Sequence, residues 1–148
     1  MNPLYPVLIK TWYEGNALSD LPSASKACKC DFRENFDVIA DLRKESNTYG
    51  QWRGFYLSSE NHKSLFVPKG FAHGFLSLCD GSTVMYQCDG VYDKETDTGI
   101  LFCDADIDVK WSVEVSAMIV GQRDRALMSF REFDGKCGFD YKNNNIKI

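Results

Sequence analysis

A histidine and a tyrosine in neighbouring apolar segments offer an acid–base pair. His73 lies between two phenylalanines in GFAHGF, directly after a Pro-Lys-Gly turn, and Tyr86 follows in TVMYQCD. If the two segments are adjacent antiparallel strands, they direct an imidazole and a phenol into one cavity, which is the pairing that proton transfer needs. Asp124, in GQRDRA, is placed in the sequence to orient such a histidine. Each of the three also has a structural interpretation, as core histidine, core tyrosine and solvated surface carboxylate.

Metal ligands are sparse by comparison. The sequence has two histidines, His62 and His73, and no Cys-x-x-Cys pair. A three-histidine site or a zinc knuckle is therefore not expected. Cys28 and Cys30 share one face if the chain is extended, but two thiols alone more often pack than bind metal. We expect no metal and no cofactor.

Six short segments rich in β-branched and aromatic residues could carry these side chains. Clusters of Gly, Pro, Asn, Asp and Ser separate them, and they span residues 36–42, 52–58, 64–68, 73–79, 83–89 and 99–103. Strands at such short spacing with tight turns indicate an all-β sandwich or barrel. Within 83–89, the alternation puts Val84, Tyr86 and Cys88 on one face. Residues 113–120 and 122–130 are the places for short helical turns.

The chain length of 148 residues suits one domain. Residues 1–35 show neither a helical nor a strand period, so we predict an irregular N-terminal segment there. Residues 36–134 form the predicted β domain. The tail, residues 135–148, is rich in Asn and Lys and is expected to fray.

The composition limits the cellular location and the kinds of partner that we expect for the protein. The formal net charge of −4 provides no basic face for nucleic acid. No apolar run reaches the roughly 20 residues that span a bilayer. The first residues lack a basic leader and a cleavage site, so no secretory signal is expected. The six cysteines then favour free buried thiols over three bridges. We expect a cytoplasmic protein with no membrane partner.

Three long strings resemble the dTDP-4-dehydrorhamnose 3,5-epimerase family. They are DLRKESNTYGQWRGFYLSSENHKSLFVPKGFAHGFLSL, MYQCDGVYDKETDTGILFCDADIDVKW and QRDRA, within about residues 37 to 130. The resemblance implies a cupin-like jelly-roll barrel over 36–134 with short C-terminal helical turns. It also implies a metal-free homodimer that epimerises a dTDP-linked 4-keto-6-deoxy sugar. The ketone acidifies the two neighbouring carbons, a histidine base removes a proton, and a tyrosine protonates from the other side.

The resemblance also implies roles for particular residues. Tyr86 would be the tyrosine acid, and Asp124 would pair with the histidine base. Four further residues fall on positions near the sugar or the nucleotide: His73, Lys26, Tyr92 and Arg123. Minor departures from the family pattern are Trp111-Ser112 in place of Trp-Pro and Gly121 in place of serine.

The histidine base itself is missing. The family carries it in an Arg-Gly-Leu/Met-His-Tyr-Gln strand about ten residues before the lysine, a position that falls on Asn16, and no histidine precedes His62. We therefore expect impaired epimerase activity in this chain. The alternatives are a non-catalytic relative that binds sugar nucleotides or dimerises, and an epimerase that acts at one carbon or uses His73 as its base.

A shifted reading frame offers a reason for this misfit. Codons for Glu14 to Phe36, read one nucleotide later, permit Arg-Gly-Met-His-Tyr-Gln, then Ala-Lys-Leu-Val, then Gly-Lys-Ile. These strings supply the missing strand pair of the family. Our hypothesis is that residues from about 10 to 36 come from a frameshift, closed by a second indel near Arg33–Phe36. A genuinely diverged N-terminal arm is the alternative.

Overall fold

The computed structural model describes residues 6–7, 25–90 and 98–136. Strands supply most of the regular structure, and short helical elements follow them. The strands are β1 (Pro6–Val7), β2 (Lys26–Phe32), β3 (Glu34–Asp41), β4 (Trp52–Ser58), β5 (Ser64–Val67), β6 (Phe71–Ser77), β7 (Thr83–Cys88) and β8 (Ile119–Val120). The helical elements are the 3-10 turn η1 (Val115–Ala117), α1 (Gln122–Arg125) and α2 (Phe130–Lys136).

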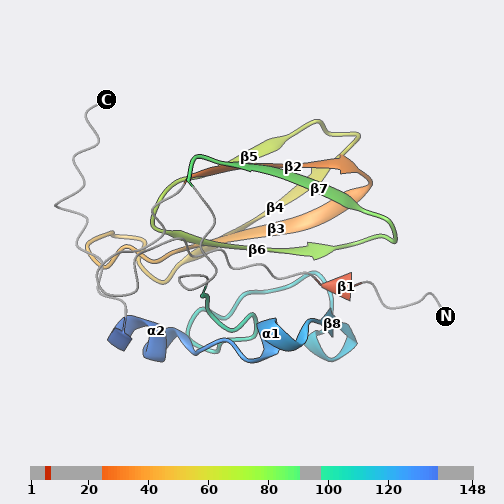
Figure 1. Cartoon of the computed structure of the whole chain (residues 1–148). Helices are drawn as coiled ribbons and strands as arrows, with labels where there is room; N and C mark the ends of the chain where they lie inside the picture. Colours follow the sequence, from red (N-terminus) through yellow and green to blue (C-terminus); the bar gives the residue numbers. More distant parts are fainter. Residues whose placement is uncertain (1–5, 8–24, 91–97, 137–148) are drawn as a thin grey trace.

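Two three-stranded antiparallel sheets lie face to face (Figure 1). Their strand orders are β5-β2-β7 and β4-β3-β6, and β1 pairs in parallel with β8. The C-terminal segment with α1 and α2 runs below the β4-β3-β6 sheet. The fold is thus the all-β jelly roll with short C-terminal helical turns that the sequence predicted.

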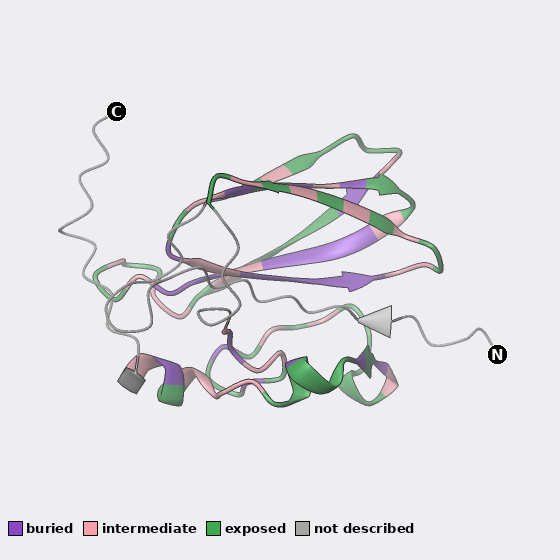
Figure 2. Cartoon of the chain, viewed as in Figure 1, coloured by how far each residue is buried: buried purple, intermediate pink, exposed green. Residues whose placement is uncertain are grey.

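The apolar core lies between the β4-β3-β6 sheet and the C-terminal segment. One face of β3 carries Phe36, Val38 and Ala40, which pack in clusters with side chains from the C-terminal segment such as Met118 and Phe133. The buried colouring of Figure 2 follows β3 and β6, the two strands that these clusters and the opposite sheet cover. This packing leaves the other face of β3, which carries Asn35, Asp37 and Asp41 beside Ile39, turned toward β2.

A close backbone contact at Gly54 on β4 belongs to the same core. A Cβ added there would lie 2.3 Å from Cζ of Phe36, so a larger residue would force the ring to move. Glycine at this position lets the Phe36 ring lie against the neighbouring strand. The packing of this part of the sheet therefore depends on both residues.

Five of the six predicted strands are confirmed, with ends that agree to within two residues. The prediction for 99–103 is wrong, because this segment makes a single bridge between Ile100 and Met128 rather than a strand. The predicted helical turns are found as η1, α1 and the start of α2. The alternation in 83–89 is also confirmed, since Val84, Tyr86 and Cys88 are half-buried and their neighbours are exposed.

The irregular segment predicted for residues 1–35 is wrong over Lys26–Phe32 and at the start of β3. Strand β2 is the centre of its sheet, and Lys26, Cys28 and Cys30 point inward while Ala27 and Asp31 are exposed. The period of two is a weak signal in this sequence because thiols stand where larger apolar side chains are usual. Residues 1–5 and 8–24, including Asn16, lie outside the described residues.

The expected boundary at residue 135 and the expected burial of the free thiols differ in part from the structure. Helix α2 crosses the boundary predicted between residues 134 and 135, and residues 137–148 lie outside the described part. The five cysteines in the described ranges are free, but burial holds only for Cys28 and Cys30, whereas Cys103 is exposed. Within the described ranges, no helix is long and apolar enough to cross a membrane.

Candidate active site

A fully buried carboxylate, Asp37 of β3, lies at the centre of a polar cluster between the two sheets. Its Oδ1 is 2.8 Å from Nε2 of His73 on β6 and 3.5 Å from Sγ of Cys28 on β2. The exposed fractions are 0% for Asp37, 2% for His73 and 1% for Cys28. Buried polar groups require partners of this kind, because an unpaired charge in the interior is costly.

The strand registers bring these three residues together. On β3 the alternation that sends Phe36 and Val38 to the apolar core sends Asp37 to the opposite face. His73 pairs with Ile39 on β3 and therefore points the same way as Asp37, diagonally across the strand pair. Strand β2, from the opposite sheet, supplies the thiol.

Lys26 and Tyr86 face the same interior. Lys26 is 7% exposed and precedes Cys28 by two residues on β2, so both side chains lie on one face. Tyr86 on β7 is the cross-strand partner of Cys28. Directly opposite residues share a face of the sheet, which places the phenol beside the thiol and toward the cluster.

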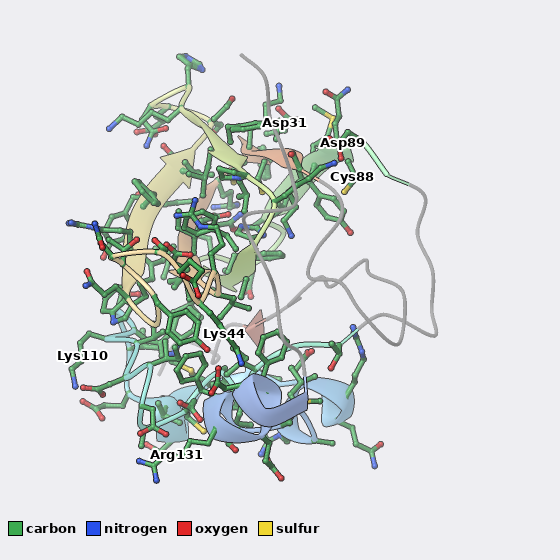
Figure 3. The ribbon with its side chains drawn as sticks, turned by 90° about the vertical axis from the view of Figure 1, so that its left-hand side faces the viewer. Asp31, Lys44, Cys88, Asp89, Lys110 and Arg131 are labelled. Carbon is green, nitrogen blue, oxygen red and sulfur yellow. The ribbon has the colours of Figure 1, made fainter. Side chains whose placement is uncertain are left out.

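Two hydrogen bonds between Ser25 and Asp89 hold the start of β2 beside the end of β7. Ser25 N donates to Oδ1 of Asp89 at 2.6 Å, and Asp89 N donates to the Ser25 carbonyl at 3.1 Å. Figure 3 shows Cys88 and Asp89 together at the end of β7, on the side of the molecule opposite Lys110 and Arg131. These two hydrogen bonds hold Lys26, the next residue after Ser25, where its side chain enters the interior.

Burial and charge set the protonation states of the cluster. Burial lowers the pKa of His73 below its usual 6.5, the hydrogen bond with Asp37 opposes this effect, and the charge of Lys26 adds to it. His73 is therefore neutral near pH 7, with Nε2–H directed at the carboxylate and a lone pair on Nδ1. Burial also raises the pKa of the Cys28 thiol, and Asp37 raises it further, so the thiol keeps its proton.

The structure brings together three of the residues that the sequence singled out: His73, Tyr86 and Lys26. Asp124 is buried on α1, but the carboxylate hydrogen-bonded to His73 is Asp37. That Asp124 pairs with a histidine base stays a prediction, and the family position of that base, Asn16, lies outside the described residues. Arg123 is exposed on α1, and Tyr92 lies outside the described residues.

Asp37, at the centre of the cluster, is the candidate residue that sequence reasoning missed. It lies in FDVIADL, where Asp41 shares its face of the strand, and Asn35 on the same face directly precedes the segment. Buried acidic residues on the strand face opposite Val38 and Ala40 indicate a partly polar interior. That signal was present in the predicted strand 36–42.

A separate hollow of about 440 Å³ opens at the turn between β2 and β3. Its lining is mixed in charge and comprises Phe32, Arg33, Glu34, Ser58, Ser59, Glu60 and Cys79. None of the cluster around Asp37 contributes to it. The chemistry of buried, convergent groups therefore favours the cluster over this hollow as the functional site.

Comparisons with known proteins identify relatives of this chain. The family model for dTDP-4-dehydrorhamnose 3,5-epimerase matches residues 20–132. The relative of that name from Methanothermobacter thermautotrophicus is 48% identical over 100 residues, 67% of this chain and 54% of the relative. The one from Escherichia coli is 37% identical over 107 residues, 72% of this chain and 57% of the relative. The chain thus spans about half the length of the curated relatives it matches.

Comparisons with solved structures identify the same family. The dTDP-4-dehydrorhamnose 3,5-epimerase of Elizabethkingia anophelis superposes with a TM-score of 0.79 at 30% identity, over 88% of this chain and 69% of that one. A Legionella pneumophila dTDP-6-deoxy-D-glucose-3,5-epimerase, in complex with dTDP-4-keto-L-rhamnose, has a TM-score of 0.79 at 27% identity, over 90% and 67% of the two chains. By its sequence and its jelly roll, the chain belongs to the dTDP-4-dehydrorhamnose 3,5-epimerase family.

Proposed function

We propose that this chain acts on a dTDP-linked 4-keto-6-deoxy sugar as a 3,5-epimerase of deoxysugar biosynthesis. The observation that carries the proposal is the buried Asp37–His73 pair, which shares an interior with Lys26 and Tyr86. The names of the relatives and the ligand of the Legionella pneumophila structure support the substrate class.

The chemistry begins at the ketone. A carbonyl acidifies the hydrogens on the two adjacent carbons, so a base can remove one of them and leave an enolate. Lys26, a cation in a water-poor interior, is suited to stabilise the negative charge that develops on the oxygen. Tyr86 is proposed to return a proton from the opposite face, which inverts the carbon.

The chain offers two histidines as candidates for the base that removes the substrate proton. His62 is exposed on a turn, so His73 is the single buried imidazole. Asp37 accepts the Nε2–H and leaves the Nδ1 lone pair of His73 for a substrate proton, the orienting role that a carboxylate plays beside a histidine base. We propose that proton removal in this chain depends on His73, at a rate about 10²- to 10⁴-fold below that of a relative with a dedicated base.

A solvent-exchange experiment tests this function. The chain is incubated with dTDP-4-keto-6-deoxyglucose in D₂O, and deuterium at the carbons beside the ketone is followed by NMR. We expect slow incorporation that Tyr86→Phe reduces further and that the matched variant Tyr56→Phe, on the exposed side of β4, leaves unchanged. Calorimetry with dTDP separates the alternatives, since binding without any exchange identifies a non-catalytic sugar-nucleotide relative, and no binding contradicts both.

We also propose that the chain forms a homodimer in the cytoplasm. Large apolar side chains are exposed on the sheets, among them Phe66 at 63% and Phe32 at 53%. Such side chains are suited to contact a second copy of the chain. Analytical ultracentrifugation should give a dimer that Phe66→Ser weakens. The free thiols of the described cysteines support a reducing compartment.

A further inference from the structure

The cluster at Asp37 contains a thiol that epimerisation does not use. Cys28 Sγ, one Asp37 carboxylate oxygen and a ring nitrogen of His73 all lie within 4.8 Å of one another. All three residues are buried. Thiolate, carboxylate and imidazole are the ligand types that Zn²⁺ takes in proteins.

We propose that Cys28, Asp37 and His73 form a three-ligand site for a divalent transition-metal ion, with Zn²⁺ as the ion of choice. Three protein ligands with an open fourth position is the arrangement of reactive rather than structural zinc sites. Such a site goes beyond the proposed epimerase function and stands whether or not the chain epimerises a sugar. The ligands come from β2, β3 and β6, so their spacing along the chain gives no metal-binding motif.

The separations fit an ion with small adjustments. Tetrahedral bonds of about 2.0 to 2.3 Å place ligand atoms roughly 3.3 to 3.6 Å apart. Cys28 Sγ and Asp37 Oδ1 are already 3.5 Å apart, whereas Asp37 Oδ1 and His73 Nε2 are 2.8 Å apart and must separate slightly. Asp37 Oδ2 is buried and has no hydrogen-bond partner among the described residues, so the carboxylate has a second oxygen to offer.

The charges balance when the ion binds. Zn²⁺ displaces the thiol proton of Cys28 to solvent, and the neutral His73 ring gives Nε2 to the metal while its proton moves to Nδ1. The dication, the thiolate and the carboxylate then sum to zero, which a buried site requires. The buried Lys26 lies nearby and opposes a cation, so we expect an affinity in the micromolar range rather than a tighter one.

A bound ion would compete with the sugar chemistry. It takes the same ring nitrogen of His73 that otherwise donates to Asp37, and it holds that ring in one orientation. The structure therefore assigns Zn²⁺ an inhibitory effect wherever the epimerase reaction relies on His73. The metal test itself needs no turnover.

Co²⁺ is the probe, because a cobalt–thiolate bond gives a near-ultraviolet charge-transfer band that Zn²⁺ abolishes. The reduced full chain should bind one Co²⁺ with this band and release it to Zn²⁺. Cys28→Ser should weaken binding by about 100-fold or more and remove the band. Cys28→Val keeps an apolar side chain at this buried position and guards against loss of the fold, which circular dichroism monitors.

Cys30→Ser is the matched control. Cys30 is buried on the same face of β2, but its thiol donates to the Phe32 carbonyl at 3.1 Å. Its replacement should leave the affinity and the band unchanged. The proposal is overturned if no saturable band forms, if Cys28→Val retains it in a folded chain, or if Cys30→Ser removes it as completely as Cys28→Ser.

Discussion

His73 donates its Nε2–H to Oδ1 of Asp37 over 2.8 Å, and neither side chain is more than 2% exposed. The pair joins the neighbouring strands β6 and β3 on the face that lines the interior between the sheets, and an apolar core lies on the other side of β3. A buried imidazole and a buried carboxylate each depend on the other for a partner. Changes to either residue should therefore be visible both in chemistry and in stability.

Replacement of Asp37 by asparagine should slow proton exchange more than it weakens binding. The amide introduced by Asp37→Asn would no longer fix the tautomer of His73, so the lone pair on Nδ1 is lost in part of the molecules. We expect deuterium incorporation to fall by about 10- to 100-fold or more while the calorimetric affinity for dTDP changes little. The control is Asp31→Asn, which removes an exposed carboxylate on β2. Equal losses in binding and exchange would contradict an orienting role.

The stability of the fold should decrease as the pH falls from 7 to 5. Burial lowers the pKa of His73 below 6.5, so the unfolded chain binds this proton more readily than the folded one. The contribution of His73 is complete above pH 6.5 and is lost as the pH falls toward its folded pKa. Against burial, hydrogen bonds from Arg43 lower the pKa of Asp41, and those from Tyr49 lower the pKa of Asp134. The carboxyl groups of Asp41 and Asp134 therefore have pKa values below the usual 3.8, and they do not titrate between pH 7 and 5.

Urea denaturation at several pH values measures this effect. His73→Gln should flatten the dependence between pH 7 and 5, and His62→Gln, which changes the exposed histidine, should not. A dependence that survives in folded His73→Gln would assign the effect to another group.

Arg33→Gly should stabilise the protein. Arg33 connects β2 to β3 with a φ of 68°, a left-handed conformation that disfavours a side chain. Glycine adopts it without this penalty, so we expect the free energy of unfolding to rise by about 1 kcal/mol. The control is Arg53→Gly inside β4, where glycine should instead destabilise the strand. A lower denaturation midpoint for Arg33→Gly would refute the prediction.

Asn35→Leu should also stabilise the protein. Asn35 is fully buried on β3, and neither its amide nitrogen nor its amide oxygen has a hydrogen-bond partner among the described residues. An apolar side chain of similar size removes that cost, worth about 1 to 3 kcal/mol. Asn61→Leu is the matched control, because the Asn61 side chain bonds Ser58 and Lys63 and its loss should destabilise the turn. A folded Asn35→Leu variant with a lower denaturation midpoint than the wild-type chain would count against this prediction.

The two stabilising changes bear on the reading frame. Arg33 and Asn35 are the residues at which the shifted frame gives glycine and isoleucine, and both are poorly suited to their backbone or surroundings as written. This supports the hypothesis that a frameshift produced residues from about 10 to 36. Sequencing the coding DNA from Met1 through Asp37 tests it, since stop codons in the shifted frame would rule it out.

Strands with β-branched and aromatic residues were predictable, because their composition and their turns are local signals. Strand β2 was not, since its inward side chains are Lys26, Cys28 and Cys30 and none of them counts as a usual strand core residue. His73, Tyr86 and Lys26 were singled out from the sequence, and the structure places them around one interior. Asp37 was missed because its pairing with His73 depends on the register of β3 and β6, which a single sequence does not reveal.

The most direct test compares the two histidines of the chain in the solvent-exchange reaction. His73→Asn and His62→Asn are each incubated with dTDP-4-keto-6-deoxyglucose in D₂O, and dTDP binding is measured in parallel. The account predicts that His62→Asn exchanges at the wild-type rate and that His73→Asn, still folded, loses exchange by at least about 100-fold. Exchange that persists in His73→Asn, or a wild-type chain that binds dTDP and never exchanges a proton, would contradict it.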